Sequence, residues 1–134
     1  MKKDIDFLKV KDLAVAIVPE NDDPEFPLFS AYLINRKKIN LQGVFIRIKG
    51  SGLVDGEKVE TATIRVFFEN VAPNTFVKID DFEAKAAALS NEYWVSFKEN
   101  NYLFDKKYIF VPESIVESNF TQIPILGKRG VLIS

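Results

Sequence analysis

The chain of 134 residues contains no cysteine and no histidine. Without cysteine there are no disulfide bonds, and without either residue there are no thiol–imidazole catalytic pairs and no common zinc ligand set. We therefore expect no cofactor, no metal and no catalytic residue of these kinds. A cysteine-free chain is compatible with a reducing compartment.

Neither sign of charge dominates, because 18 basic and 19 acidic residues give a net charge of −1. No overall field therefore attracts nucleic acid or an anionic membrane. The apolar content of 47% is that of a globular protein rather than a disordered one. A chain of this length buries about two thirds of its unfolded surface. We predict a single domain that spans residues 1–134.

Long hydrophobic runs are missing near the N-terminus. The apolar run at 13–18 has six residues, and acidic and basic residues precede it. This run is too short for the core of a signal peptide or for a membrane span. We expect a soluble, cytoplasmic protein with no membrane partner.

Short segments in which apolar residues alternate with polar ones are typical of strands. We predict about seven strands, at 13–18, 28–34, 39–49, 59–68 and 75–79 and in the two arms of a hairpin at 91–111. The turn signals between them and the scarcity of helical segments indicate an all-β fold. An antiparallel, immunoglobulin-like β-sandwich is our first choice.

The hairpin at 91–111 holds the only tryptophan and three of the four tyrosines. Asn100 and Asn101 tolerate positive φ and close a tight turn. A two-residue turn pairs Phe97 with Phe104 and Tyr93 with Tyr108. Tyr93 also stands where a tyrosine corner occurs in immunoglobulin-like folds. We expect the rest of the chain to pack around this hairpin.

One short helix is expected in the window 80–89, where alanines follow two aspartates that are able to cap it. Ten residues form only a marginal helix in isolation. We predict a shared core in which the strands meet. Its expected members are Val44, Ile46, Ile48, Ile64, Val66, Tyr93, Val95 and Phe97.

The C-terminal segment at 113–134 is predicted to pack on the domain or on a partner chain, because a solvated tail does not usually keep so many apolar residues. Pro124 favours an extended path at 122–126. Gly127 and Gly130 indicate a turn around Lys128 and Arg129. Residues 131–133 are then expected to dock as a strand, on their own sheet or on a second chain.

Three acidic or glycine-rich stretches are candidate sites. The loop 20–25 carries Glu20, Asp22, Asp23 and Glu25, which either form a solvated loop or hold calcium; the spacing is not that of an EF-hand. The glycines at 50–56 precede a strand and not a helix, so a hairpin loop is favoured over a phosphate loop. Asp80 and Asp81 serve acid–base chemistry only if burial separates their pKa values.

Basic clusters and one exposed aromatic residue define the surface that we expect to meet a partner. Cations combined with stacked aromatic rings hold single-stranded RNA, and an outward Phe45 adds to that option. Turns also carry lysine and arginine simply for solubility, and the near-neutral net charge favours that reading. The candidate interaction residues are Trp94, Arg36, Lys37, Lys38, Lys128 and Arg129.

Several segments, none of them a specific motif, together resemble a family of small uncharacterised bacterial proteins of about this length. These segments are 13–19, 32–35, 55–61, 91–97, 105–112 and 128–131. Members of the family have been labelled phenylalanyl-tRNA synthetase alpha subunit. The resemblance implies no site residue. Outside the segment 128–131 the arginines are Arg36, Arg47 and Arg65. They do not form an ATP-binding motif, so we expect no aminoacylation activity.

The sequence therefore favours a non-catalytic interaction module with a protein partner, and a homodimer is one form of such a partnership. An RNA- or ribosome-associated accessory protein is the alternative, although the charge balance makes nucleic acid the weaker choice of partner. A carboxylate-only enzyme ranks last.

Overall fold

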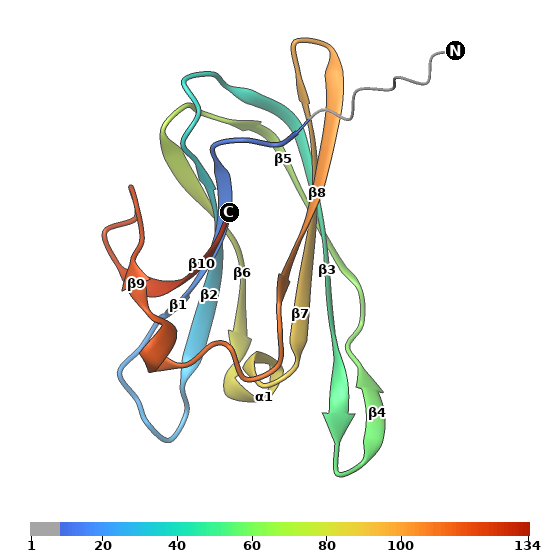
Figure 1. Cartoon of the computed structure of the whole chain (residues 1–134), viewed down its shortest axis with the longest axis vertical. Helices are drawn as coiled ribbons and strands as arrows, with labels where there is room; N and C mark the ends of the chain where they lie inside the picture. The colour runs from blue at the N-terminus through green and yellow to red at the C-terminus, as the bar shows by residue number, and fades with distance from the viewer. Residues whose placement is uncertain (1–8) are drawn as a thin grey trace.

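The computed structural model describes residues 9–134, which form two five-stranded antiparallel sheets facing each other (Figure 1). Sheet 1 has the order β6-β2-β1-β10-β9. Its strands are β6 (Thr75–Glu83), β2 (Leu28–Asn35), β1 (Leu13–Pro19), β10 (Arg129–Ile133) and β9 (Thr121–Gln122). The predicted all-β sandwich is confirmed.

Sheet 2 has the order β4-β3-β7-β8, and β5 also pairs with β3. Its strands are β3 (Leu41–Val54), β4 (Glu57–Glu60), β5 (Ile64–Val71), β7 (Ser90–Glu99) and β8 (Tyr102–Phe110). The hairpin of β3 and β4 extends beyond the body of the sandwich (Figure 1). The helix α1 (Ala84–Ala87) lies in the predicted window, and a 3₁₀ turn, η1 (Glu117–Asn119), follows β8.

Strands that follow one another along the chain are divided between the two sheets. β1, β2 and β6 lie in sheet 1, whereas β3, β7 and β8 lie in sheet 2. The predicted tyrosine corner is wrong, because the Tyr93 hydroxyl crosses the sandwich and lies 3.5 Å from the Asp80 carboxylate.

The aromatic hairpin forms as its sequence predicts. Asn100 and Asn101 have φ values of 51° and 66°, so both adopt the left-handed conformation that this turn requires. Tyr93 pairs with Tyr108, and the ring of Phe97 stacks on that of Phe104 at 5.3 Å. The Tyr108 hydroxyl donates a hydrogen bond of 3.2 Å to a backbone carbonyl of β1, which ties the two sheets together.

The main core lies between the sheets. Six of the eight predicted members are buried there, and Val66 packs against them while half-buried. Ile64 is the exception, since 48% of it is exposed. It is the first residue of β5, which has only β3 as a neighbour in the sheet. An end position on an edge strand lacks the neighbours that cover a central one.

The predicted single strand at 59–68 is also wrong, because residues 61–63 leave the ladder and divide it into β4 and β5. Thr61 holds this break in place. Its backbone N–H donates to the carbonyl of Gly50 at 2.9 Å, and its hydroxyl accepts from the N–H of Gly50 at 2.8 Å. This division and the two strands of the tail raise the strand count above the expected seven.

The tail docks on its own chain, as one of the two predicted outcomes requires. β10 pairs with β1, with Val131 opposite Ile17 and Ile133 opposite Val15. Gly130 permits the close approach, because a Cβ at this position would lie 2.3 Å from the carbonyl oxygen of Ile17. This pairing places β10 between β1 and β9 in sheet 1.

A second, smaller core forms where the tail crosses the outer face of sheet 1. The extended path predicted at 122–126 is wrong, because the chain turns at Pro124 and Ile125, whose φ is 69°. This turn lays Ile123 and Leu126 on the sheet. The buried residues of the second core are Ala14, Ala16, Val18, Tyr32, Ile34 and Ile123. β1 is consequently covered on both faces.

No helix within residues 9–134 is long and apolar enough to cross a membrane.

Truncation of a core aromatic residue and of an edge residue separates buried from exposed positions. We expect Phe97→Ala to lower the free energy of unfolding by about 3–5 kcal/mol, through lost transfer energy and a residual cavity. The matched control Ile64→Ala should lose less than about 1 kcal/mol, because its side chain keeps contact with water. Urea denaturation with unchanged m values measures both. Equal losses would contradict the assignment of Ile64 to the edge.

Candidate functional site

The outer face of sheet 2 carries the candidate site. Successive side chains of a strand point to opposite faces of a sheet, so residues on either side of a buried position face outward. Ile46 and Ile48 are buried in the core, which places Arg47 on the outer face. Tyr93 and Val95 do the same for Trp94 on β7.

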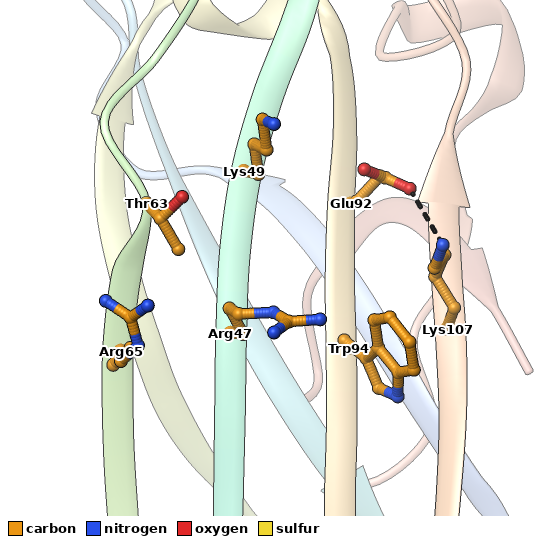
Figure 2. A pocket seen from close by; sticks show the side chains of 7 residues that line it. All are labelled: Arg47, Lys49, Thr63, Arg65, Glu92, Trp94 and Lys107. Carbon is orange, nitrogen blue, oxygen red and sulfur yellow. Dashed lines mark ion pairs between the residues drawn. The ribbon is translucent and has the colours of Figure 1, made fainter.

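Strand register brings four of these outward residues into one line. Arg65 lies opposite Arg47, Arg47 lies opposite Trp94, and Trp94 lies opposite Lys107. The line crosses β5, β3, β7 and β8 (Figure 2). We call these four residues the cationic row.

Trp94 stands between two cations of the row. The guanidinium carbon of Arg47 lies 4.6 Å from the centre of its ring, and the Lys107 ammonium lies 4.7 Å from it. The two cations reach the ring from the strands on either side of β7 (Figure 2). Each such contact contributes about 0.5–1 kcal/mol at an exposed site. A nucleic-acid base would have to displace one of them before it could stack on Trp94.

The lysines around the row have acidic partners, whereas its two arginines have none. Lys107 pairs with Glu92 at 3.4 Å, and Lys49 pairs with Glu60 at 3.5 Å. Within residues 9–134, neither Arg47 nor Arg65 makes an ion pair or a side-chain hydrogen bond. Like charges directly opposite each other on neighbouring strands are destabilising. The face therefore carries positive charge that the described protein does not balance.

These side chains surround a shallow hollow of about 310 Å³. Its lining holds four cations and a single carboxylate, which already pairs with Lys107. The lining residues are Arg47, Lys49, Thr63, Arg65, Glu92, Trp94 and Lys107 (Figure 2). The hollow offers guanidinium and hydroxyl donors to an oxyanion.

The chain matches no protein-family model and no curated protein. It is similar to the crystal structure of Spo0M, a sporulation control protein from Bacillus subtilis, with 9% identity and a TM-score of 0.35. The likeness covers 76% of this chain and 49% of that one, so this chain spans about half of its length. A likeness at this level assigns no residue to a site.

The interaction residues predicted from sequence do not meet in the structure. Trp94 lies in the cationic row, but residues 36–38 form the loop between β2 and β3, where Lys37 pairs with Glu99 at 3.1 Å. Lys128 pairs with Glu20 at 3.4 Å, beside sheet 1. Arg129 donates to the carbonyl of Phe120 at 3.1 Å. The basic residues that are neighbours in the sequence lie in or near turns. The residues of the cationic row come instead from four different strands.

Arg47, Arg65 and Lys107 were missed as site residues. Alternation along β3 was enough to place Arg47 outward, because buried residues flank it. No signal in the sequence, however, places Arg65 beside it or Lys107 beside Trp94. Those contacts depend on register between strands that are distant in the chain.

The acidic loop at 20–25 has a structural role for some of its side chains. Asp23 accepts hydrogen bonds from the backbone N–H groups of Glu25 at 2.9 Å and Phe26 at 3.4 Å. Glu20 pairs with Lys128. Across residues 9–134, no three acidic side chains converge closely enough to hold a metal ion.

Asp80 and Asp81 differ in environment, but they do not share a site. A register shift in the pairing of β2 with β6 precedes them, and afterwards Asp80 points between the sheets toward Tyr93. Asp81 points to the outer face of sheet 1, where it accepts a hydrogen bond from Ser30 and pairs with Lys78 at 3.3 Å. Carboxylates on opposite faces of one sheet cannot act on the same substrate.

Burial raises the pKa of Asp80 to about 6 from 3.8, although the Tyr93 hydroxyl opposes the shift. The hydrogen bond from Ser30 lowers the pKa of Asp81. The folded protein thus favours the neutral form of one carboxyl group and the charged form of its neighbour.

Removal of one arginine from the row tests the unbalanced charge. We expect Arg65→Gln to raise the free energy of unfolding by about 0.2–1 kcal/mol, because it relieves like-charge repulsion across β3 and β5. The gain should shrink in about 1 M salt, where the screening length is only about 3 Å. Arg36→Gln, in the β2–β3 loop, serves as the control and should change little. Lower stability for Arg65→Gln would show that Arg65 has a compensating partner.

Replacement of Asp80 tests the buried carboxyl group. Its folded pKa is raised, so its contribution to stability is complete below about pH 4 and is lost as the pH rises through about 6. We therefore expect Asp80→Asn to be more stable than the parent at pH 7.5, by roughly 1–3 kcal/mol. Thermal melts from pH 3.5 to pH 8 measure the difference.

The neighbouring residue supplies the control for this pH profile. Asp81→Asn removes a carboxylate whose pKa is lowered, so it should lose stability at neutral pH and little at low pH. Identical pH profiles for the two variants would contradict the opposite placement of these carboxyl groups.

Proposed function

We propose that the protein is a non-catalytic binding module and that its cationic row holds an anionic group of a partner. The observation that carries this proposal is the opposed pair Arg47 and Arg65, which lacks an acidic partner in the described residues. An oxyanion that reaches both guanidinium groups would form two charge-assisted interactions with them.

The geometry of the row suits recognition of an oxyanion. Guanidinium groups present several donors in a planar fork and match carboxylate or phosphate oxygens. Trp94 limits where the Arg47 side chain lies, so less conformational freedom is lost when a ligand binds. The Thr63 hydroxyl lines the same hollow and adds a donor (Figure 2).

The same chemistry favours binding over catalysis. An arginine keeps its proton throughout the physiological pH range, so it serves neither as a general base nor as a general acid. Glu92 is the carboxylate in this hollow, and it pairs with Lys107 at 3.4 Å. The two arginines of the row are therefore suited to positioning charge.

An RNA-associated role remains the second candidate. Cations next to exposed aromatic rings on a sheet are the elements that hold single strands. Phe45 is 41% exposed on the same face, which favours this candidate. The occupied ring of Trp94 weighs against it. A steep dependence of affinity on salt would distinguish RNA from a ligand that carries one or two charges.

The single tryptophan makes the proposal directly testable, because its fluorescence reports on the row. We expect inorganic phosphate or citrate to change the Trp94 emission saturably, with calorimetry as an independent measure. Arg65→Gln should weaken binding roughly tenfold, since a charge-assisted contact contributes about 1.5–3 kcal/mol. Arg36→Gln should bind like the parent. Absence of saturable binding, or equal weakening by both variants, would overturn the proposal.

A further inference from the structure

An apolar pair lies directly beside the cationic row. Phe45 and Phe67 are opposite each other on β3 and β5, two positions along these strands from Arg47 and Arg65. Their exposed fractions are 41% and 61%. Exposed apolar residues are common on protein surfaces when they are scattered singly. Here two aromatic side chains adjoin each other, so the surface has an apolar part next to a positively charged part.

The face contains a second hollow next to the first. Its volume is about 300 Å³, and it shares Arg47 and Trp94 with the hollow described above. The lining residues are Phe45, Arg47, Trp94, Ser96 and Asp105. One ligand that spans both hollows would meet the arginine pair in the first and an aromatic ring in the second.

We propose that the partner is a protein that presents an extended acidic segment, with a carboxylate side chain at one position and an apolar side chain two positions later. This inference rests on the proposed function and names its ligand class. The two rows of sheet 2 are two residues apart along β3, which is about 6.6–6.8 Å. Side chains on one face of an extended peptide repeat with the same spacing. The carboxylate meets Arg47 and Arg65, and the apolar group covers Phe45 and Phe67.

Charge on the face favours such a segment over a nucleic acid. Asp105 lines the second hollow and Glu92 lines the first, so a continuous polyanion would meet carboxylates on both sides of Trp94. A peptide that places its charge at the arginine pair alone avoids both. The net charge of −1 also gives no general attraction to a polyanion.

A second copy of this chain fits the face less well. Its acidic loop carries the exposed Phe26, but Glu25 immediately precedes it. Residues 24–26 form bends and not an extended segment, so this loop does not offer the regular two-residue spacing of an extended peptide. Asp23 is also engaged in hydrogen bonds within its own loop.

The experiment compares two short synthetic peptides of identical composition in a Gly/Ser background. One separates Glu from Phe by a single residue, and the other places them side by side. We expect the spaced peptide to bind roughly tenfold more tightly, because only it buries its apolar side chain on the aromatic pair. Trp94 fluorescence and peptide anisotropy measure both affinities, and citrate serves as the small anion.

Three variants of the full chain separate the contributions. Arg65→Gln should weaken citrate and the spaced peptide alike. Phe67→Ala should weaken the peptide roughly tenfold and leave citrate unchanged, because citrate has no apolar group. Leu53→Ala removes a residue that is 72% exposed on the β3–β4 hairpin and is the matched control. Melting curves show whether each variant is folded.

The outcomes are distinguishable. No citrate binding would overturn the proposed function itself. Citrate binding with no preference for spacing, or with no effect of Phe67→Ala, would overturn the peptide inference alone. A single-stranded oligonucleotide that binds more tightly than the peptide, with a steep salt dependence, would replace it by the RNA candidate. A concentration-dependent mass that Arg65→Gln abolishes would replace it by self-association.

Discussion

The backbone ladder that joins β3 to β5 on one side and to β7 on the other is the constraint on which the core and the candidate site both depend. In this register Arg47 has Arg65 on one side and Trp94 on the other. Because side chains alternate along a strand, a slip of one residue would turn Ile46 outward and Arg47 into the core. The cost of burying an unpaired charge excludes that alternative. The hydrophobic core thus fixes the positions of the cations.

The tail explains why the outer face of sheet 2 is the one that remains open. β10 joins sheet 1 beside β1, and the turn before it lies on the outer face of the sheet, so β1 is buried on both of its faces. Gly130 allows β10 to approach β1, and Ile123 fills the outer side. Phe76 of β6, opposite Ile34, is still 41% exposed on this face. The outer side of β3, β5, β7 and β8 keeps both its charges and its exposed aromatic rings.

The cationic row and the carboxyl group of Asp80 lie in different parts of the sandwich, the row on the outer face of sheet 2 and Asp80 between the sheets. Asp80 lies between the sheets, where burial and the neighbouring Tyr93 determine its ionisation. A change of pH between about 4 and 6 consequently acts on the stability of the sandwich.

The sequence by itself determined the class of fold, the aromatic hairpin and the outward face of β3. Alternation settled that Arg47 points away from Ile46, and two asparagines settled the turn that pairs Phe97 with Phe104. Only the tertiary structure decided which strands are neighbours, because register between distant segments depends on long-range packing and not on local period. In the tertiary structure Arg65 lies beside Arg47, and Ile64 is exposed at an edge. The basic clusters of the turns lie away from Trp94. Local pattern assigns a side chain to a face, whereas its neighbours on that face come from the pairing of strands far apart in the chain.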